Sequence, residues 1–86
     1  MMREIGDITI STNPQGATIY VDSTLATNER GEPLTTPVKL TLNEGTHRFM
    51  LVRSGYSDDY EHVYIFPESD LMLHRDLTYQ YPPTSQ

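Results

Sequence analysis

Three histidines are the first residues of this sequence whose chemistry could serve a site. His47, His62 and His74 carry imidazole groups, and zinc is bound where three or four such ligands converge. No two of them have the close spacing of a local zinc motif, and each falls in a different predicted strand. The sequence also contains no cysteine that could add a thiolate. We therefore interpret the histidines as exposed or core-edge side chains and predict no metal site.

The acidic stretch SDDYE at residues 57–61 is the second candidate. Its carboxylates, Asp58, Asp59 and Glu61, could offer oxygen ligands to calcium. The stretch lacks the regular acidic spacing and the glycine of a calcium loop, however. We interpret it as part of a solvated loop.

Catalytic groups show no recognisable arrangement. No serine is surrounded by the pattern of a nucleophile elbow. A pair of carboxylates for glycoside chemistry needs a cleft, and a chain of 86 residues has little volume left for one. We predict that the protein is not an enzyme and that it uses no cofactor.

Charge and length narrow the classes of partner. Twelve acidic and six basic residues give a net charge of −6, which repels phosphate backbones and anionic lipids. The charge therefore makes us expect no nucleic-acid ligand. We also expect no membrane insertion, because no apolar run approaches the about 18 residues of a transmembrane helix. The N-terminus also lacks the apolar region of a signal peptide, so we expect a soluble chain without an export signal.

The elements that must position these residues are strands. Apolar and polar residues alternate in pairs of segments joined by turn signals, and Pro14 and Gly16 suit the first turn. We expect a hairpin at the first turn and a second hairpin at the turn NEG, residues 43–45. The alternating segments are residues 8–11, 17–22, 38–42, 47–51, 63–65 and 71–77.

No segment repeats apolar residues at helical spacing. The predicted fold is therefore all-β: a small antiparallel β-sandwich of about six strands without a significant helix. We place a single domain at residues 1–78 and a polar, proline-rich tail at residues 79–86, flexible or draped over a partner. Residues 24–36 are long for a hairpin connection, and loops of this length are either functional or mobile.

The order of turns and strands resembles the PEGA domain, a small β-sandwich module named after the residues of its first turn. Pro14, Gly16 and Ala17 match that turn, and Gln15 stands in the place of the glutamate. The later family markers match at Thr36 with Pro37, Gly45 with His47, and Gly55 with Tyr56. The similarity covers residues 6–77, nearly the whole chain.

Two departures from the family pattern concern the second turn. Ser23 occupies the place of the glycine that commonly follows Asp22, and the segment before Thr36 is longer than usual. We therefore expect an extended loop in place of the tight hairpin there. The resemblance implies a non-enzymatic module of surface-associated or multidomain proteins, and it brings no catalytic residues with it.

A failure of alternation gives the strongest functional indication. The predicted strands also carry apolar residues at the positions that alternate with the inward-facing ones. A solvated sheet face would carry polar residues at these positions. If these strands lie in one sheet, the residues form an outer apolar patch of the kind that marks interaction sites. An alternative is that the long loop or the tail covers some of them. The patch residues are Met50, Val52, Tyr64, Phe66 and Met72.

From the patch we predict a non-catalytic module that binds other protein subunits, as a homo- or hetero-oligomer. Tyr79 and Tyr81 in the tail could drape over a neighbouring subunit, although a frayed terminus fits them equally well. The small size and the missing export signal suit a subunit of a larger assembly, such as a decoration, neck or tail component of a bacteriophage virion assembled in the host cytoplasm.

The competing prediction is a carbohydrate- or peptide-binding module of a cell-surface or envelope protein. Such a module would hold a cell-surface glycan or a peptide through loops at one end of the sandwich. The residues that would carry this function are Asn28, Glu29, Arg30, Glu32, Asp58, Asp59 and Tyr60.

Overall fold

A computed structural model describes residues 4–80 of the chain. These residues form seven strands and no helix, so none of them belongs to a helix that could cross a membrane. The strands are β1 (Ile5–Asn13), β2 (Thr18–Val21), β3 (Thr24–Leu25), β4 (Val38–Asn43), β5 (Gly45–Val52), β6 (Asp59–Ile65) and β7 (Asp70–Asp76).

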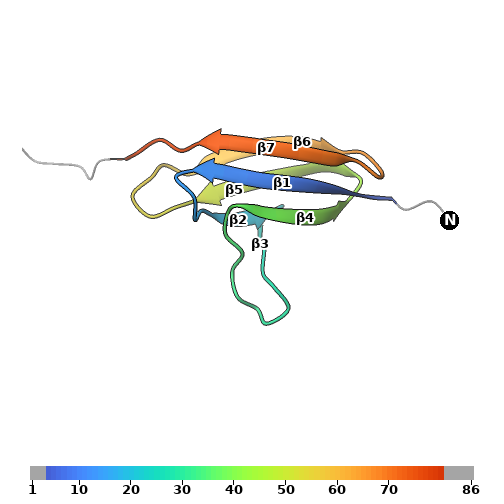
Figure 1. The fold of residues 1–86 in the computed structure, drawn as a ribbon, viewed down its shortest axis with the longest axis horizontal. Coiled ribbons are helices and arrows are strands. Elements are labelled where there is room, and N and C mark those ends of the chain that lie inside the picture. The colour runs from blue at the N-terminus through green and yellow to red at the C-terminus, as the bar shows by residue number, and fades with distance from the viewer. Residues whose placement is uncertain (1–3, 81–86) are drawn as a thin grey trace, which may run out of the picture.

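The strands are arranged in two sheets that stack as two layers (Figure 1). The β1 sheet has the order β4-β1-β7, and the β5 sheet has the order β3-β2-β5-β6. This confirms the all-β prediction. The additional strand is β3, which has only two residues and is too short to show an alternating pattern.

The core lies between the sheets and follows the predicted alternation. Every second residue of β1 is buried, and Phe49 and Leu51 of β5 face it from the other sheet. Burying these side chains supplies the main stabilisation of a domain this small. The fully or almost fully buried apolar residues are Ile8, Ile10, Ala17, Ile19, Phe49, Leu51 and Ile65.

One strand pair is parallel, which corrects the expectation of a purely antiparallel sandwich. β1 and β7 run in the same direction, with Ile8 opposite Leu71 and Ile10 opposite Leu73. The chain reverses direction at each of the six connections, so the seventh strand ends parallel to the first. The two strands lie side by side in the β1 sheet, and the four aliphatic side chains pack in or against the core between the sheets.

The two predicted hairpins are also wrong. The turn at residues 13–16 and the turn at residues 43–45 each join strands of different sheets, as does the turn between β6 and β7. The paired hairpins are instead β2 with β3 and β5 with β6. Alternation shows which side chains point inward, but it does not show whether a turn folds back within a sheet or crosses to the opposite one.

The β2–β3 turn is tight, contrary to the extended loop expected there. Asp22 and Ser23 both adopt left-handed conformations, with φ of 51° and 71°, as a two-residue turn of type I′ requires. Asp22 Oδ1 accepts a hydrogen bond from the backbone N–H of Arg48 at 2.9 Å, which holds the turn against β5. The additional length lies after the hairpin, in the loop of residues 26–37 that projects from the body of the molecule (Figure 1).

Two buried threonines hold the first turn in place. Thr12 Oγ1 donates to the carbonyl of Pro14 at 2.8 Å and lies 2.6 Å from Thr36 Oγ1. Thr36 Oγ1 in turn accepts from the backbone N–H of Ala17 at 3.0 Å. These bonds explain why a threonine before Pro37 accompanies the turn at residues 13–16, although the two segments are distant in sequence.

Candidate interaction surface

An apolar row crosses the outer face of the β5 sheet. Tyr20 of β2 lies opposite Met50 of β5, and Met50 lies opposite Tyr60 of β6. On the other side, Tyr20 pairs with Leu25 of β3. Residues directly opposite each other in a sheet project to the same side. We call Leu25, Tyr20, Met50 and Tyr60 the apolar row; it reaches from one edge of the sheet to the other.

The row borders a shallow groove of about 90 Å³. Tyr60, which is 64% exposed, closes the groove at the β6 edge. Tyr20 and Met50 are half-buried within the sheet surface. The residues lining the groove are Tyr20, Ser23, Arg48, Phe49, Met50 and Tyr60.

A second aromatic group lies on the same face, near the end of β6. Tyr64 and Phe66 are 46% and 58% exposed, and their ring centroids are 4.8 Å apart. Between this pair and the apolar row, Arg48 lies opposite His62. Val52, opposite Thr18, extends the face beyond the apolar row in the other direction.

Acidic side chains are missing from the outward strand positions of the β5 sheet. In the described strands, these positions hold only threonines, the apolar and aromatic residues above, Arg48 and His62. Arg48 is therefore the one side chain of fixed charge among them. These outward positions therefore carry no negative charge, although the chain as a whole has a net charge of −6.

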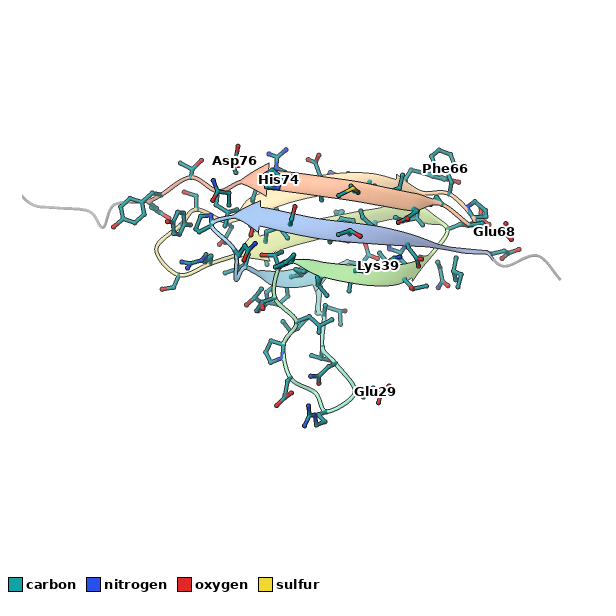
Figure 2. The ribbon with its side chains drawn as sticks, viewed as in Figure 1. Glu29, Lys39, Phe66, Glu68, His74 and Asp76 are labelled. Carbon is teal, nitrogen blue, oxygen red and sulfur yellow. The ribbon has the colours of Figure 1, made fainter. Side chains whose placement is uncertain are left out.

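The outer face of the β1 sheet is polar, and Met72 belongs to it. Met72 of β7 is 81% exposed and lies opposite Thr9 of β1, which in turn lies opposite Lys39 of β4. Figure 2 shows Lys39, His74 and Asp76 on this sheet. The prediction of one patch containing Met72 is therefore wrong, because β7 pairs with β1 while β5 and β6 belong to the other sheet.

Sequence reasoning missed two members of the surface, Tyr20 and Leu25. Tyr20 carried a usable signal, because a large apolar ring between Ile19 and Val21 breaks the alternation of β2 in the same way that Met50 breaks that of β5. Leu25 carried none, since its two-residue strand cannot be recognised from local pattern.

The start of the C-terminal segment is held to the loop between β5 and β6. Tyr79 forms an antiparallel bridge with Tyr56, their ring centroids are 5.3 Å apart, and Gln80 donates its backbone N–H to the carbonyl of Gly55 at 2.9 Å. Tyr79 remains 51% exposed. The other tyrosine of the predicted tail interaction, Tyr81, lies outside the described residues.

The residues of the competing loop site do not come together. Residues 28–32 follow β3, whereas residue 58 precedes β6 and residues 59–60 begin it. β3 and β6 form opposite edges of the β5 sheet. Asn28 organises the first segment itself: its Oδ1 accepts from the backbone N–H groups of Arg30 and Glu32. Figure 2 shows Glu29 at the tip of the projecting loop.

The second segment of that site belongs largely to β6 and not to a loop. Asp59 points between the sheets and pairs with Arg75 of β7, whose Nε and Nη2 lie 2.8 and 3.3 Å from its two carboxylate oxygens. Glu61 is a more distant partner, with 3.9 Å between its Oε2 and Arg75 Nη1. The hydrogen bond to Asp59, followed by the charge of that carboxylate, raises the pKa of Arg75 above its usual value.

The three histidines occupy three separate places. His47 lies between the sheets, His62 points outward from β6, and His74 lies on the β1 sheet, where it contacts Ser11 and Asp76. Within residues 4–80, no three histidine, cysteine, aspartate or glutamate side chains are grouped so that they could hold a metal ion.

Comparison with known proteins identifies the family of the chain. No curated protein matches the chain. The family model of the PEGA domain matches residues 5–79, from the first residue of β1 to the tyrosine that packs on Tyr56. The match includes both sheets and every strand described above, so the chain belongs to the PEGA domain family.

Proposed function

We propose that this PEGA domain is a non-catalytic protein-interaction module that binds other subunits through the outer face of the β5 sheet. The observation that carries the proposal is the apolar row, with Tyr60 exposed at one end and the Tyr64–Phe66 pair beside it. A solvated sheet face normally carries polar residues at such positions. Contiguous apolar surface on a soluble domain favours contact with another macromolecule.

The composition of the face supports a protein as the partner. Protein–protein contact regions are enriched in tyrosine, methionine and arginine and depleted in lysine, aspartate and glutamate. The outward positions of the β5 sheet follow this bias. Tyr20, Met50, Tyr60 and Arg48 are present, and none of these outward positions in the described strands holds an acidic residue or a lysine. Tyrosine and arginine are also the residues that most often dominate binding energy.

The larger setting remains a prediction. In its most specific form, the proposal is that the domain is a subunit of a bacteriophage virion, held to copies of itself or to different subunits. Binding of a glycan or a peptide by the loops remains the alternative prediction. Its two segments lie at opposite edges of the β5 sheet, so the interaction face is the better supported candidate.

The test uses a matched pair of methionines. Met50→Asp places a charge in the middle of the apolar row, and Met72→Asp makes the same change on the outer face of the other sheet. Light scattering at several concentrations measures self-association, and affinity capture from the producing cell or particle measures binding of a companion protein. We expect Met50→Asp to abolish association and Met72→Asp to leave it unchanged.

Two results would contradict the proposal. One is a wild-type protein that stays monomeric at high concentration and captures no companion. The other is association that survives Met50→Asp, or that Met72→Asp disrupts equally. Amide NMR spectra of both variants establish that each is folded before association is compared.

A further inference from the structure

We propose that β6 accepts an extended segment of a partner protein as an additional strand, in which apolar side chains alternate with lysine or arginine. This inference rests on the proposed function, because β6 borders the interaction face and the added strand would widen that face. It goes further by naming the backbone edge that is used and the chemistry of the partner.

The edge of β6 is long, and no other strand of residues 4–80 pairs with it. β6 has seven residues, it pairs with β5 on one side, and it ends the order β3-β2-β5-β6. Outside the strand ladders, no backbone hydrogen bond among the described residues involves residues 59–65. A row of unpaired N–H and C=O groups is a ready template for another strand.

The edge strand β7, which has the same length as β6, is protected in a way that β6 is not. The outward side chains of β7 are Asp70, Met72, His74 and Asp76, so three of the four are polar or charged. Charged side chains are a common means of keeping an edge strand solvated. The outward side chains of β6 are Tyr60, His62 and Tyr64. An added strand could place apolar side chains beside these rings, because neighbouring strands project alternate residues to the same side.

The remaining side chains of the added strand would point toward the gap between the sheets. There they would meet Asp59 and Glu61, which share the single guanidinium of Arg75. Asp59 is satisfied by two contacts with Arg75, whereas Glu61 is 3.9 Å from it and its side chain is 36% exposed. The two carboxylates thus carry one negative charge more than Arg75 offsets. Asp59 and Glu61 are alternate residues of β6, so they select for lysine or arginine at the alternate positions of the added strand that lie beside them.

The same carboxylates argue against a second copy of this chain as the strand donor. If two β6 strands paired antiparallel in a continuous sheet, Asp59 and Glu61 of both copies would lie on the same side of that sheet, where their charges repel. Inward-pointing charges of this kind prevent promiscuous edge pairing. The sequence also contains no two lysine or arginine residues two positions apart. The donor is therefore a different protein.

The experiment uses the full chain and an acetylated peptide in which valine and lysine alternate. A second peptide has glutamate in place of each lysine. Two further lysine peptides are N-methylated, one at every lysine amide and the other at every valine amide. We expect the lysine peptide to bind, to protect β6 amides from hydrogen exchange, and to bind better than the glutamate peptide. Because alternate amides of a strand point to opposite sides, only one of the two methylated peptides should lose binding.

A charge reversal provides the matched control. From the size of cross-strand charge effects, Glu61→Lys should weaken binding of the lysine peptide by roughly tenfold and reverse the preference toward the glutamate peptide. Asp70→Lys makes the same change of charge on β7 and should leave binding unchanged. Glu61→Gln, which gives a smaller loss, replaces Glu61→Lys if the latter does not fold.

Strand addition would be overturned by equal binding of the lysine and glutamate peptides, by protection of β4 or β7 in place of β6, or by equal effects of the two sets of N-methyl groups. A peptide that contacts Tyr20 and Met50 without protecting β6 amides would overturn strand addition and leave the interaction face in place. The proposed function is tested separately: it would be overturned if Met50→Asp did not abolish association, or if Met72→Asp disrupted association equally.

Discussion

His47 Nδ1 lies 2.6 Å from Asp22 Oδ2, and the opposite ring nitrogen, Nε2, lies 2.7 Å from the backbone carbonyl of Asn43. Both partners are acceptors, so only the doubly protonated imidazolium can donate to both. The side chain of His47 is 14% exposed. It connects β5 to the β2–β3 turn and to the end of β4 in the other sheet, and thus acts as a clamp between the sheets.

The clamp makes stability depend on pH. Burial lowers the pKa of His47, but the bond to the Asn43 carbonyl and then the bond to Asp22 outweigh this effect and raise the pKa above the ordinary value of 6.5. Because the folded pKa is the higher one, the stabilisation is fully present below about pH 6.5 and is lost as pH rises through the folded pKa. We expect His47→Gln to lower the free energy of unfolding by about 1 to 3 kcal/mol near pH 6, and by less at about pH 9.

Urea denaturation across this pH range measures the difference between wild type and variant. His74→Gln is the control, since His74 is an exposed histidine with a nearby aspartate, and its effect should be small at every pH. A His47→Gln effect that stays constant from about pH 6 to about pH 9 would show that the clamp is not an imidazolium.

Protonation of Asp22 should weaken the clamp at low pH. The backbone N–H of Arg48, and then the hydrogen bond from His47, lower the pKa of Asp22 below its ordinary value of 3.8. Its stabilisation is therefore present above about pH 3.8 and is lost as pH falls through the lowered folded pKa. Asp22→Asn should flatten the acid limb of the stability profile. An unchanged acid limb, again measured by urea denaturation, would contradict this assignment.

Thr36→Val should destabilise the first turn without changing the shape of the side chain. The variant removes the hydroxyl that accepts from the backbone N–H of Ala17, a fully buried residue. Leaving such a group without a partner costs about 1 to 3 kcal/mol in the free energy of unfolding. Thr36→Ser keeps the hydroxyl and is the control; denaturation that places both variants at the same stability would show that the bond is not responsible.

Gly6→Ala should be strongly destabilising. A Cβ at this position of β1 would meet the backbone carbonyl oxygen of Phe66 and come within 2.6 Å of Ser69 Oγ. Backbone must then shift, and overpacking of this kind costs about 1 to 3 kcal/mol or more. Ser11→Ala introduces the same residue on the outer face of β1 and should have a small effect on thermal unfolding. Equal melting temperatures for the two variants would contradict the close approach.

The two carboxylates beside Arg75 should differ in coupling energy. Double-mutant cycles with Arg75→Gln should give about 1 kcal/mol for Asp59→Asn, whose carboxylate makes two contacts, and only a few tenths for Glu61→Gln, because both groups are partly exposed. Equal coupling would mean that Glu61 is as fully engaged as Asp59, and it would weaken the argument that Glu61 receives a cation from a partner.

The alternation of apolar and polar residues along each strand was sufficient to predict which side chains face the core. Ile8, Ile10, Phe49 and Leu51 face the core as predicted, because a period of two relates each side chain only to its own strand. The same reasoning found Met50 and Tyr64 on an outer face, and the turn residues identified the PEGA family.

Only the tertiary structure decided which strands are neighbours. It separated Met72 from Met50 by placing β7 beside β1, and it added Tyr20 and Leu25 to the apolar row through the pairing of β2 with β3 and β5. A turn that folds back within a sheet and a turn that crosses to the opposite sheet use similar residues. Packing between distant segments chooses between them, and neither the strand alternation nor the turn residues record that choice.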